Sequence, residues 1–171
     1  MYLKTSLLAV AMFACATTVA CATPSTSGAL AVPANRIAGL WNAQAAIGPC
    51  GSGVTPIAVN NTLLFHPGGT VSEGAKFPPG GAPNVFGVAG LNQRNDGLGT
   101  WSFDPATEVY AFHLRFDWYV DGAYHGYQTV DREIMLSADG QQAFGPVHTV
   151  RYAANGSAIA ELCGSAVQQR L

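Results

Sequence analysis

Polar side chains that could do chemistry alternate with aromatic ones between Val109 and Val120, in the sequence VYAFHLRFDWYV. The polar set on this stretch and on the return segment, residues 126–136, comprises His113, Arg115, Asp117, Tyr119, Tyr127, Asp131 and Glu133. A base, a cation and carboxylates on one sheet patch could bind a polar head group or polarise a carbonyl. Because the aromatic face suits a barrel interior better, we interpret the polar face as a solvated outer surface with cross-strand charge pairs.

The aromatic face could instead line a cavity that accepts a hydrophobic ligand. The candidate cavity residues are Trp101, Tyr110, Phe112, Phe116, Trp118 and Arg132. Only Tyr110 and Arg132 among them are ionisable, and an enzyme needs at least one such group at its substrate whereas a binding protein needs none. A fully packed interior is the alternative, because a barrel of eight strands is just wide enough to be filled or to hold one small ligand.

Other catalytic and metal-binding patterns are missing from the sequence. The four histidines, which lie at positions 66, 113, 125 and 148, lack the close spacing of a zinc site, so we predict no metal. Gly51-Ser52-Gly53 lacks the pattern of a nucleophile elbow and is interpreted as a flexible turn. No glycine-rich loop opens a predicted helix, so we expect no nucleotide and no other cofactor.

The first 22 residues have the pattern of a secretory signal peptide, with one lysine followed by an apolar segment and small residues. Ala20 and Ala22 fit a cleavage site that would release a free protein. The sequence around Cys21 also resembles a bacterial lipobox, in which this cysteine becomes the lipidated first residue. Thr18 stands where that motif usually has leucine. We therefore expect an exported protein, periplasmic or extracellular, either free or anchored to a membrane through Cys21.

Residues 23–35 are rich in proline, serine, threonine and alanine and are predicted to form a disordered linker, with a single domain over residues 36–171. The chain after residue 22 carries seven basic and ten acidic residues without a basic cluster, so nucleic acid is not an expected partner. It has no second apolar segment of the roughly 20 residues that a membrane span requires. Membrane contact would therefore depend on a lipid at Cys21.

Cys50 and Cys163 are the two cysteines of this domain, and they lie near its two ends. In an oxidising compartment a disulfide between them is the expected state. A thiolate metal site has little support, because neither cysteine has a second cysteine or a histidine at metal-ligand spacing.

Strands and turns alternate along the domain, and no stretch keeps a helical period. Turns are predicted at residues 66–69, 104–107, 121–122, 137–140 and 154–156, with about eight strands between them. Residues 76–84 contain three prolines and should form a loop, and residues 85–91 a weak strand or more loop. This pattern predicts an all-β fold, either an antiparallel sandwich or an up-and-down barrel.

The two ends of the domain favour the barrel. Gly39-Leu40-Trp41 at the start and Arg170 at the end resemble the signature of calycins, the lipocalin-like small barrels, and residues 63–70, LLFHPGGT, are similar to a hairpin of bacterial lipocalin-like domains. The resemblance implies a barrel of about eight strands in which Arg170 packs across Trp41 and latches the first strand to the last. The strand pattern is also similar to that of the small allene oxide cyclase barrels.

The resemblance and the aromatic face together predict an exported barrel that binds a small hydrophobic or amphipathic ligand in its interior. The alternatives are a small-barrel cyclase or isomerase of the allene oxide cyclase type, and a cell-envelope protein with a structural or interaction role. We favour binding over catalysis, because few ionisable side chains fall on the predicted interior face.

Overall fold

The alternating stretch forms a long hairpin of two strands, β7 (Val109–Val120) and β8 (Ala123–Leu136). The computed structural model describes residues 32–171. Asp121 and Gly122 make the turn with φ of 49° and 81°, the backbone conformation that tight hairpins need. Every second side chain of β7, from Tyr110 to Trp118, is buried, so the aromatic face points inward.

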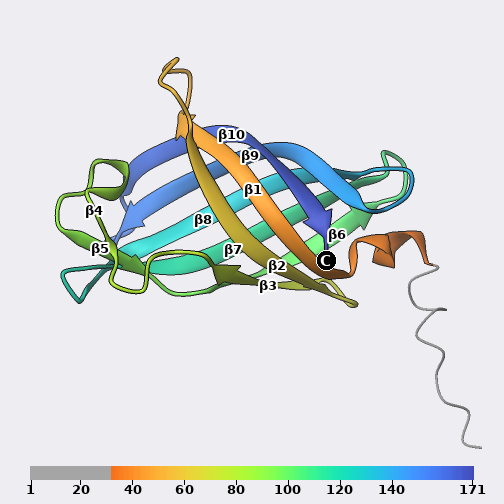
Figure 1. Ribbon diagram of the computed structural model, residues 1–171, viewed down its shortest axis with the longest axis horizontal. Helices are drawn as coiled ribbons and strands as arrows, with labels where there is room; N and C mark the ends of the chain where they lie inside the picture. Colours follow the sequence, from red (N-terminus) through yellow and green to blue (C-terminus); the bar gives the residue numbers. More distant parts are fainter. Residues whose placement is uncertain (1–31) are drawn as a thin grey trace, which may run out of the picture.

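Eight antiparallel strands, including this hairpin, close into a barrel (Figure 1). Their circular order is β1-β2-β3-β6-β7-β8-β9-β10, and β10 pairs with β1 to complete the circle. The other six barrel strands are β1 (Gly39–Pro49), β2 (Ile57–His66), β3 (Thr70–Ala75), β6 (Gly97–Asp104), β9 (Gln142–Ala153) and β10 (Ala158–Arg170). The prediction of an antiparallel up-and-down barrel of about eight strands is confirmed, and the sandwich is excluded.

The segment between β3 and β6 leaves the barrel wall and covers one end of the barrel (Figure 1). It contains β4 (Ala82–Pro83), the 3-10 helix η2 (Val85–Gly87) and β5 (Leu91–Arg94), which pairs with the end of β7. The alternative of a weak strand over residues 85–91 is wrong, because Phe86 has a φ of 52° that a strand does not accommodate. We call residues 77–90 the end loop.

The opposite end of the barrel is closed by the 3-10 helix η1 (Pro33–Ile37). Ile37 is fully buried in the aromatic core. The Tyr110 hydroxyl donates a hydrogen bond of 2.7 Å to the Pro33 carbonyl. Residues 33–35, which the sequence assigns to the linker, are therefore part of the fold.

Arg170, at the end of β10, lies across the ring of Trp41 at the start of β1, with its guanidinium carbon 4.3 Å from the ring centroid. Its Nε donates to the Gly140 carbonyl, and its two terminal nitrogens donate to the carbonyls of Ala38 and Arg36. A Cβ on Gly39 would stand 2.7 Å from this guanidinium, so the glycine gives the arginine room. Arg170 thus connects η1, the first strand and the last.

Replacing Arg170 with alanine should lower the free energy of unfolding by about 1–3 kcal/mol, because the ring contact is lost and carbonyls lose their donors. Denaturant unfolding of the variant against the wild type measures this change. Gln169→Ala is the matched control, since Gln169 is the exposed neighbour on the same strand. Equal stability of the two variants would show that Arg170 does not hold the barrel closed.

Candidate ligand-binding cavity

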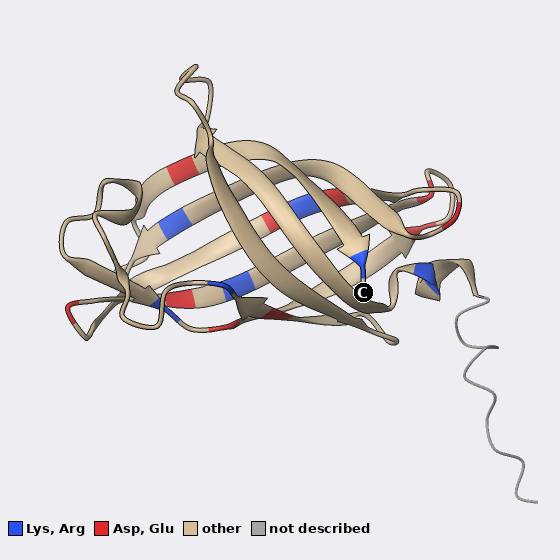
Figure 2. Cartoon of the chain, in the orientation of Figure 1, with Lys and Arg blue, Asp and Glu red and all other residues tan. Residues whose placement is uncertain are grey.

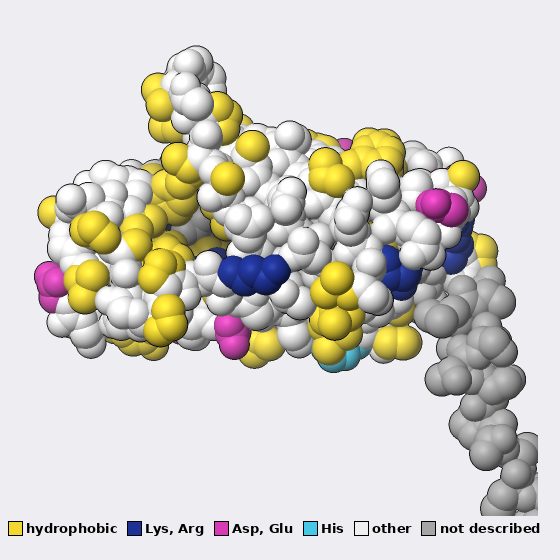
Figure 3. Space-filling model, viewed as in Figure 1, with side chains coloured by type: hydrophobic (Ala, Val, Ile, Leu, Met, Phe, Trp, Pro, Cys, Tyr) yellow, Lys and Arg dark blue, Asp and Glu magenta, His cyan; other side chains and the backbone are white. Residues whose placement is uncertain are grey.

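A cavity of about 850 Å³ occupies the part of the barrel interior next to the end loop. Figure 3 shows a hollow bordered by hydrophobic side chains beneath the protruding loop that joins β1 to β2. Its mouth is formed by residues of that loop, such as Val54, and by Phe77 and Phe86 of the end loop. The volume lies within the range of about 300–1,000 Å³ that is typical of small-molecule sites.

The period of two along each strand explains which side chains reach this cavity. The interior-facing residues of β7 and β8 contribute one wall, and those of β1, β9 and β10 contribute the facing walls. The main wall residues are Ala43, Ala45, Ile47, Phe112, Leu114, Phe116, Trp118, Gln128, Val130, Val147 and Leu162. Most of these side chains are apolar, so the cavity is suited to an apolar molecule.

Four of the predicted cavity residues, Phe112, Phe116, Trp118 and Arg132, line this cavity. Trp101 and Tyr110 are not among the residues that line it. Both are buried in the aromatic core nearer to η1, and Trp101 also borders a second, more open pocket, which it shares with Phe112 and Arg132. Trp101 Nε1 donates to the carbonyls of His66 and Thr70, and Tyr110 is bonded to η1 as described above.

The polar groups on the wall beside Trp118 are satisfied by one another. Trp118 Nε1 donates to Gln128 Oε1 at 2.8 Å, and the Gln128 amide nitrogen donates to the Thr149 hydroxyl oxygen at 2.6 Å. Thr149 in turn donates to the Thr129 carbonyl. This chain of bonds fixes the Trp118 ring, and it leaves the apolar face of the indole available to the cavity.

Arg132 of β8 has a different environment from these paired groups. Its exposed fraction is 8%, and it makes no hydrogen bond or ion pair with any described residue. The nearest aromatic face is that of Phe112, whose centroid is 6.0 Å from the guanidinium carbon. Burial lowers the pKa of Arg132 to about 10, so the side chain still carries its positive charge at neutral pH.

Glu73 of β3 and Arg94 of β5 form a buried ion pair at the cavity wall, which the sequence analysis missed. The Arg94 guanidinium also lies over the Phe116 ring, 3.3 Å from its centroid. Burial raises the pKa of Glu73 above its ordinary value, and the charge of Arg94 opposes this shift. The alternation of Val71 and Glu73 along β3 was the sequence signal that could have placed this carboxylate inside.

Arg151 of β9 anchors the end loop to the barrel, and it was also missed. Its guanidinium donates to the Val85 carbonyl and, at 2.8 Å, to Asn92 Oδ1, and it lies 4.2 Å from the Trp118 centroid. Burial lowers its pKa to about 10. These bonds hold Phe86 with its ring edge-on to Trp118, at a centroid distance of 6.5 Å. The position of the cavity mouth therefore depends on Arg151.

The polar face of the hairpin lies on the outer wall. His113 Nδ1 is 2.6 Å from Asp131 Oδ1, and both side chains are about half exposed. The Arg115 guanidinium lies over the Tyr127 ring on the neighbouring strand. Figure 2 shows acidic and basic residues interspersed along the strands. This is the arrangement of cross-strand pairs on a solvated sheet surface.

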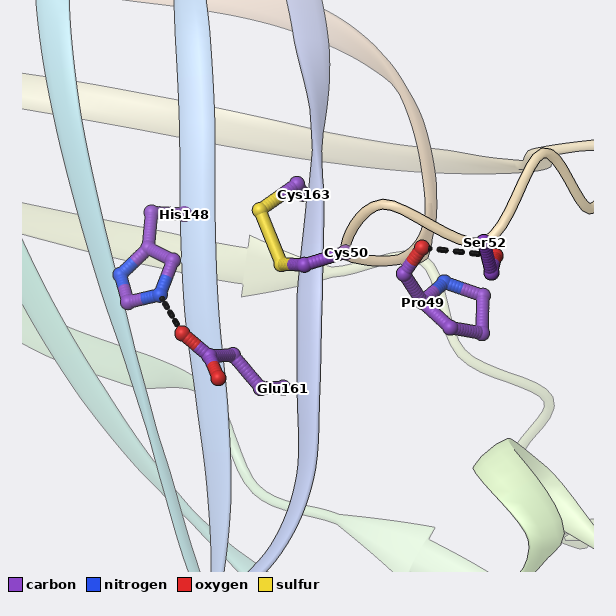
Figure 4. The surroundings of a disulfide bond; sticks show 6 residues. All are labelled: Pro49, Cys50, Ser52, His148, Glu161 and Cys163. Atoms are coloured by element: carbon purple, nitrogen blue, oxygen red, sulfur yellow. Dashed lines mark hydrogen bonds and ion pairs between the residues drawn. A yellow bond between two sulfur atoms is a disulfide. The ribbon is translucent and has the colours of Figure 1, made fainter.

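The predicted disulfide between Cys50 and Cys163 is present, and it joins the end of β1 to β10 (Figure 4). His148 lies beside it, with Nε2 at 2.8 Å from Glu161 Oε1. Cys50, His148 and Cys163 are close enough to share a metal ion. Because the two sulfur atoms are bonded to each other, they are not available as thiolate ligands.

The predicted signal peptide, the lipidation candidate Cys21 and most of the predicted linker lie outside the described residues. Within residues 32–171, no helix is long and apolar enough to cross a membrane.

The chain matches no protein-family model, no curated protein and no solved structure. The likeness to lipocalin-like barrels therefore rests on the fold and on the residues described above.

Proposed function

We propose that this protein binds a small apolar or amphipathic molecule inside its barrel. The observation that supports this function best is the cavity of about 850 Å³ among Phe112, Phe116 and Trp118. Transferring a ligand from water to such walls contributes roughly 25 cal/mol for each Å² of apolar surface buried, without any acid or base. The disulfide and the signal-like N-terminus support a site of action outside the reducing cytosol.

The neutral fluorescent probe N-phenyl-1-naphthylamine tests this function. It should bind the wild type with a saturable rise in emission. Ala45 faces the cavity, whereas Ala46 is exposed on the outer wall of the same strand. Ala45→Phe should fill part of the cavity and weaken probe binding about tenfold, while Ala46→Phe should leave it unchanged. Equal binding by both variants would place the probe outside the barrel and contradict the proposal.

An acid–base enzyme is the second candidate, and the presence of Glu73 and Arg132 at the cavity favours it. Burial raises the pKa of Glu73, which makes this carboxyl a better proton acceptor from a bound substrate than an ordinary, exposed one. However, one oxygen of Glu73 is occupied by Arg94, and no described histidine lines the cavity. These contacts support binding over catalysis. Proton exchange into a bound ligand from deuterated water, lost in Glu73→Gln, would reverse this preference.

A further inference from the structure

Arg132 differs from the other arginines whose side chains are buried in or across the barrel. Arg94 is paired with the Glu73 carboxylate, Arg151 donates to an amide oxygen and a carbonyl, and Arg170 donates to three carbonyls. Arg132 has none of these partners among the described residues, and its Nε and Nη2 are buried. A buried charge without a partner is costly, so such groups are normally paired.

Arg132 lies at the inner end of the cavity. On β8, Gln128 and Val130 lie toward the mouth, while Ile134, the next interior residue in the other direction, is fully buried in the core. The flanking residues on the neighbouring strands are Phe112 of β7 and Val147 of β9. The guanidinium is therefore an unpaired positive charge with free donors at the inner end of the cavity, where a second pocket also borders it.

We propose that Arg132 binds the carboxylate of an amphipathic ligand whose apolar chain extends toward the cavity mouth. This inference rests on the proposed function, and it names the ligand class. A guanidinium offers two parallel N–H donors that match the two oxygens of a carboxylate, and the single negative charge balances the single positive charge. The ligand enters head first. Its chain then lies against Phe116 and Trp118 and ends near Phe77 and Phe86.

Decanoate and decanol test this inference, because they share a chain and differ in the charged head group. Each is measured by displacement of N-phenyl-1-naphthylamine at pH 8, where both the carboxylate and the guanidinium are charged. The wild type should bind decanoate at least about tenfold more tightly than decanol. Arg132→Met should remove this preference by weakening decanoate about tenfold, with decanol changed by less than about twofold.

Arg115→Met is the matched control, since Arg115 carries the same charge on the outer wall. It should keep the preference for decanoate.

Arg132→Met should also fold at least as stably as the wild type without ligand, because it removes an unpaired buried charge. If that variant does not fold, Arg132→Gln gives the same comparison. Equal binding of decanoate and decanol by the wild type, or a preference that survives in either Arg132 variant, would overturn the inference. Failure of decanol and of the probe to bind would instead contradict the proposed function.

Discussion

Replacing Cys50 and Cys163 together with alanine should lower the free energy of unfolding by about 3–5 kcal/mol. The disulfide closes a loop with a sequence separation of 113 residues, and its removal allows the unfolded chain many more conformations. In the folded state the bond joins strands that are already paired, since Gly48 is in register with Cys163. The variant should therefore keep the fold while losing stability.

Denaturant unfolding measures this loss, and the wild type unfolded in the presence of a dithiol reductant is its control. The denaturant concentration at the midpoint of unfolding should be nearly the same for the reduced wild type as for the double variant. Because the loop that follows Cys50 borders the cavity, the variant should also release the neutral probe faster. Two free thiols in the purified wild type, or unchanged stability in the variant, would show that the bond does not contribute in this way.

Glu73→Gln should lower the free energy of unfolding by about 3–5 kcal/mol, because Arg94 keeps its charge in a buried position without its carboxylate. Arg94→Met should be similarly destabilising at neutral pH, since it leaves the Glu73 carboxylate alone. The double variant Glu73→Leu/Arg94→Met should recover most of the loss, because apolar side chains of similar size often replace a buried ion pair at little cost. Additive losses in the double variant would exclude coupling between the two charges.

The two single variants should differ in their dependence on pH. Burial raises the pKa of Glu73 above its ordinary value of 4.5, so the folded state binds this proton more tightly than the unfolded state. The contribution of Glu73 to stability therefore increases as the pH falls from the raised pKa toward 4.5. Arg94→Met should regain stability on acidification, whereas Glu73→Gln should lack this recovery. Denaturant unfolding between pH 5 and 8 distinguishes them.

The strands and the face that each strand buries could be predicted from the sequence because alternation has a period of two. This period identifies β7 and β8 nearly residue by residue, and it puts Arg132 on the interior face. The sequence has no comparable pattern that shows how far along the barrel axis an interior side chain lies. Trp101 and Tyr110 point inward as Phe116 does, but they lie nearer to η1, where Tyr110 is hydrogen-bonded to Pro33 and Trp101 to backbone carbonyls. Sequence alone therefore could not tell which interior side chains line the cavity.

The buried charges were harder to predict, because their partners are distant in the sequence. Glu73 meets Arg94 only where β5 crosses the end of the barrel, and Arg151 meets Asn92 across 59 residues. The loop-like composition of residues 76–97 gives little indication of where β5 will pair. By contrast, Cys50 and Cys163 could be paired from the sequence, because the domain offers each only one partner.

The most direct test of a ligand-accessible interior is quenching of tryptophan emission by the neutral alcohol 11-bromoundecanol. The chain has three tryptophans, and of these only Trp118 lines the cavity, while Trp41 is fully buried and Trp101 borders the separate second pocket. Bromine quenches only on close contact. The alcohol should therefore quench the wild type in a saturable, one-to-one manner, and Trp118→Phe should lose nearly all of this quenching. Quenching that is unsaturable, or that persists in Trp118→Phe, would contradict an interior binding site.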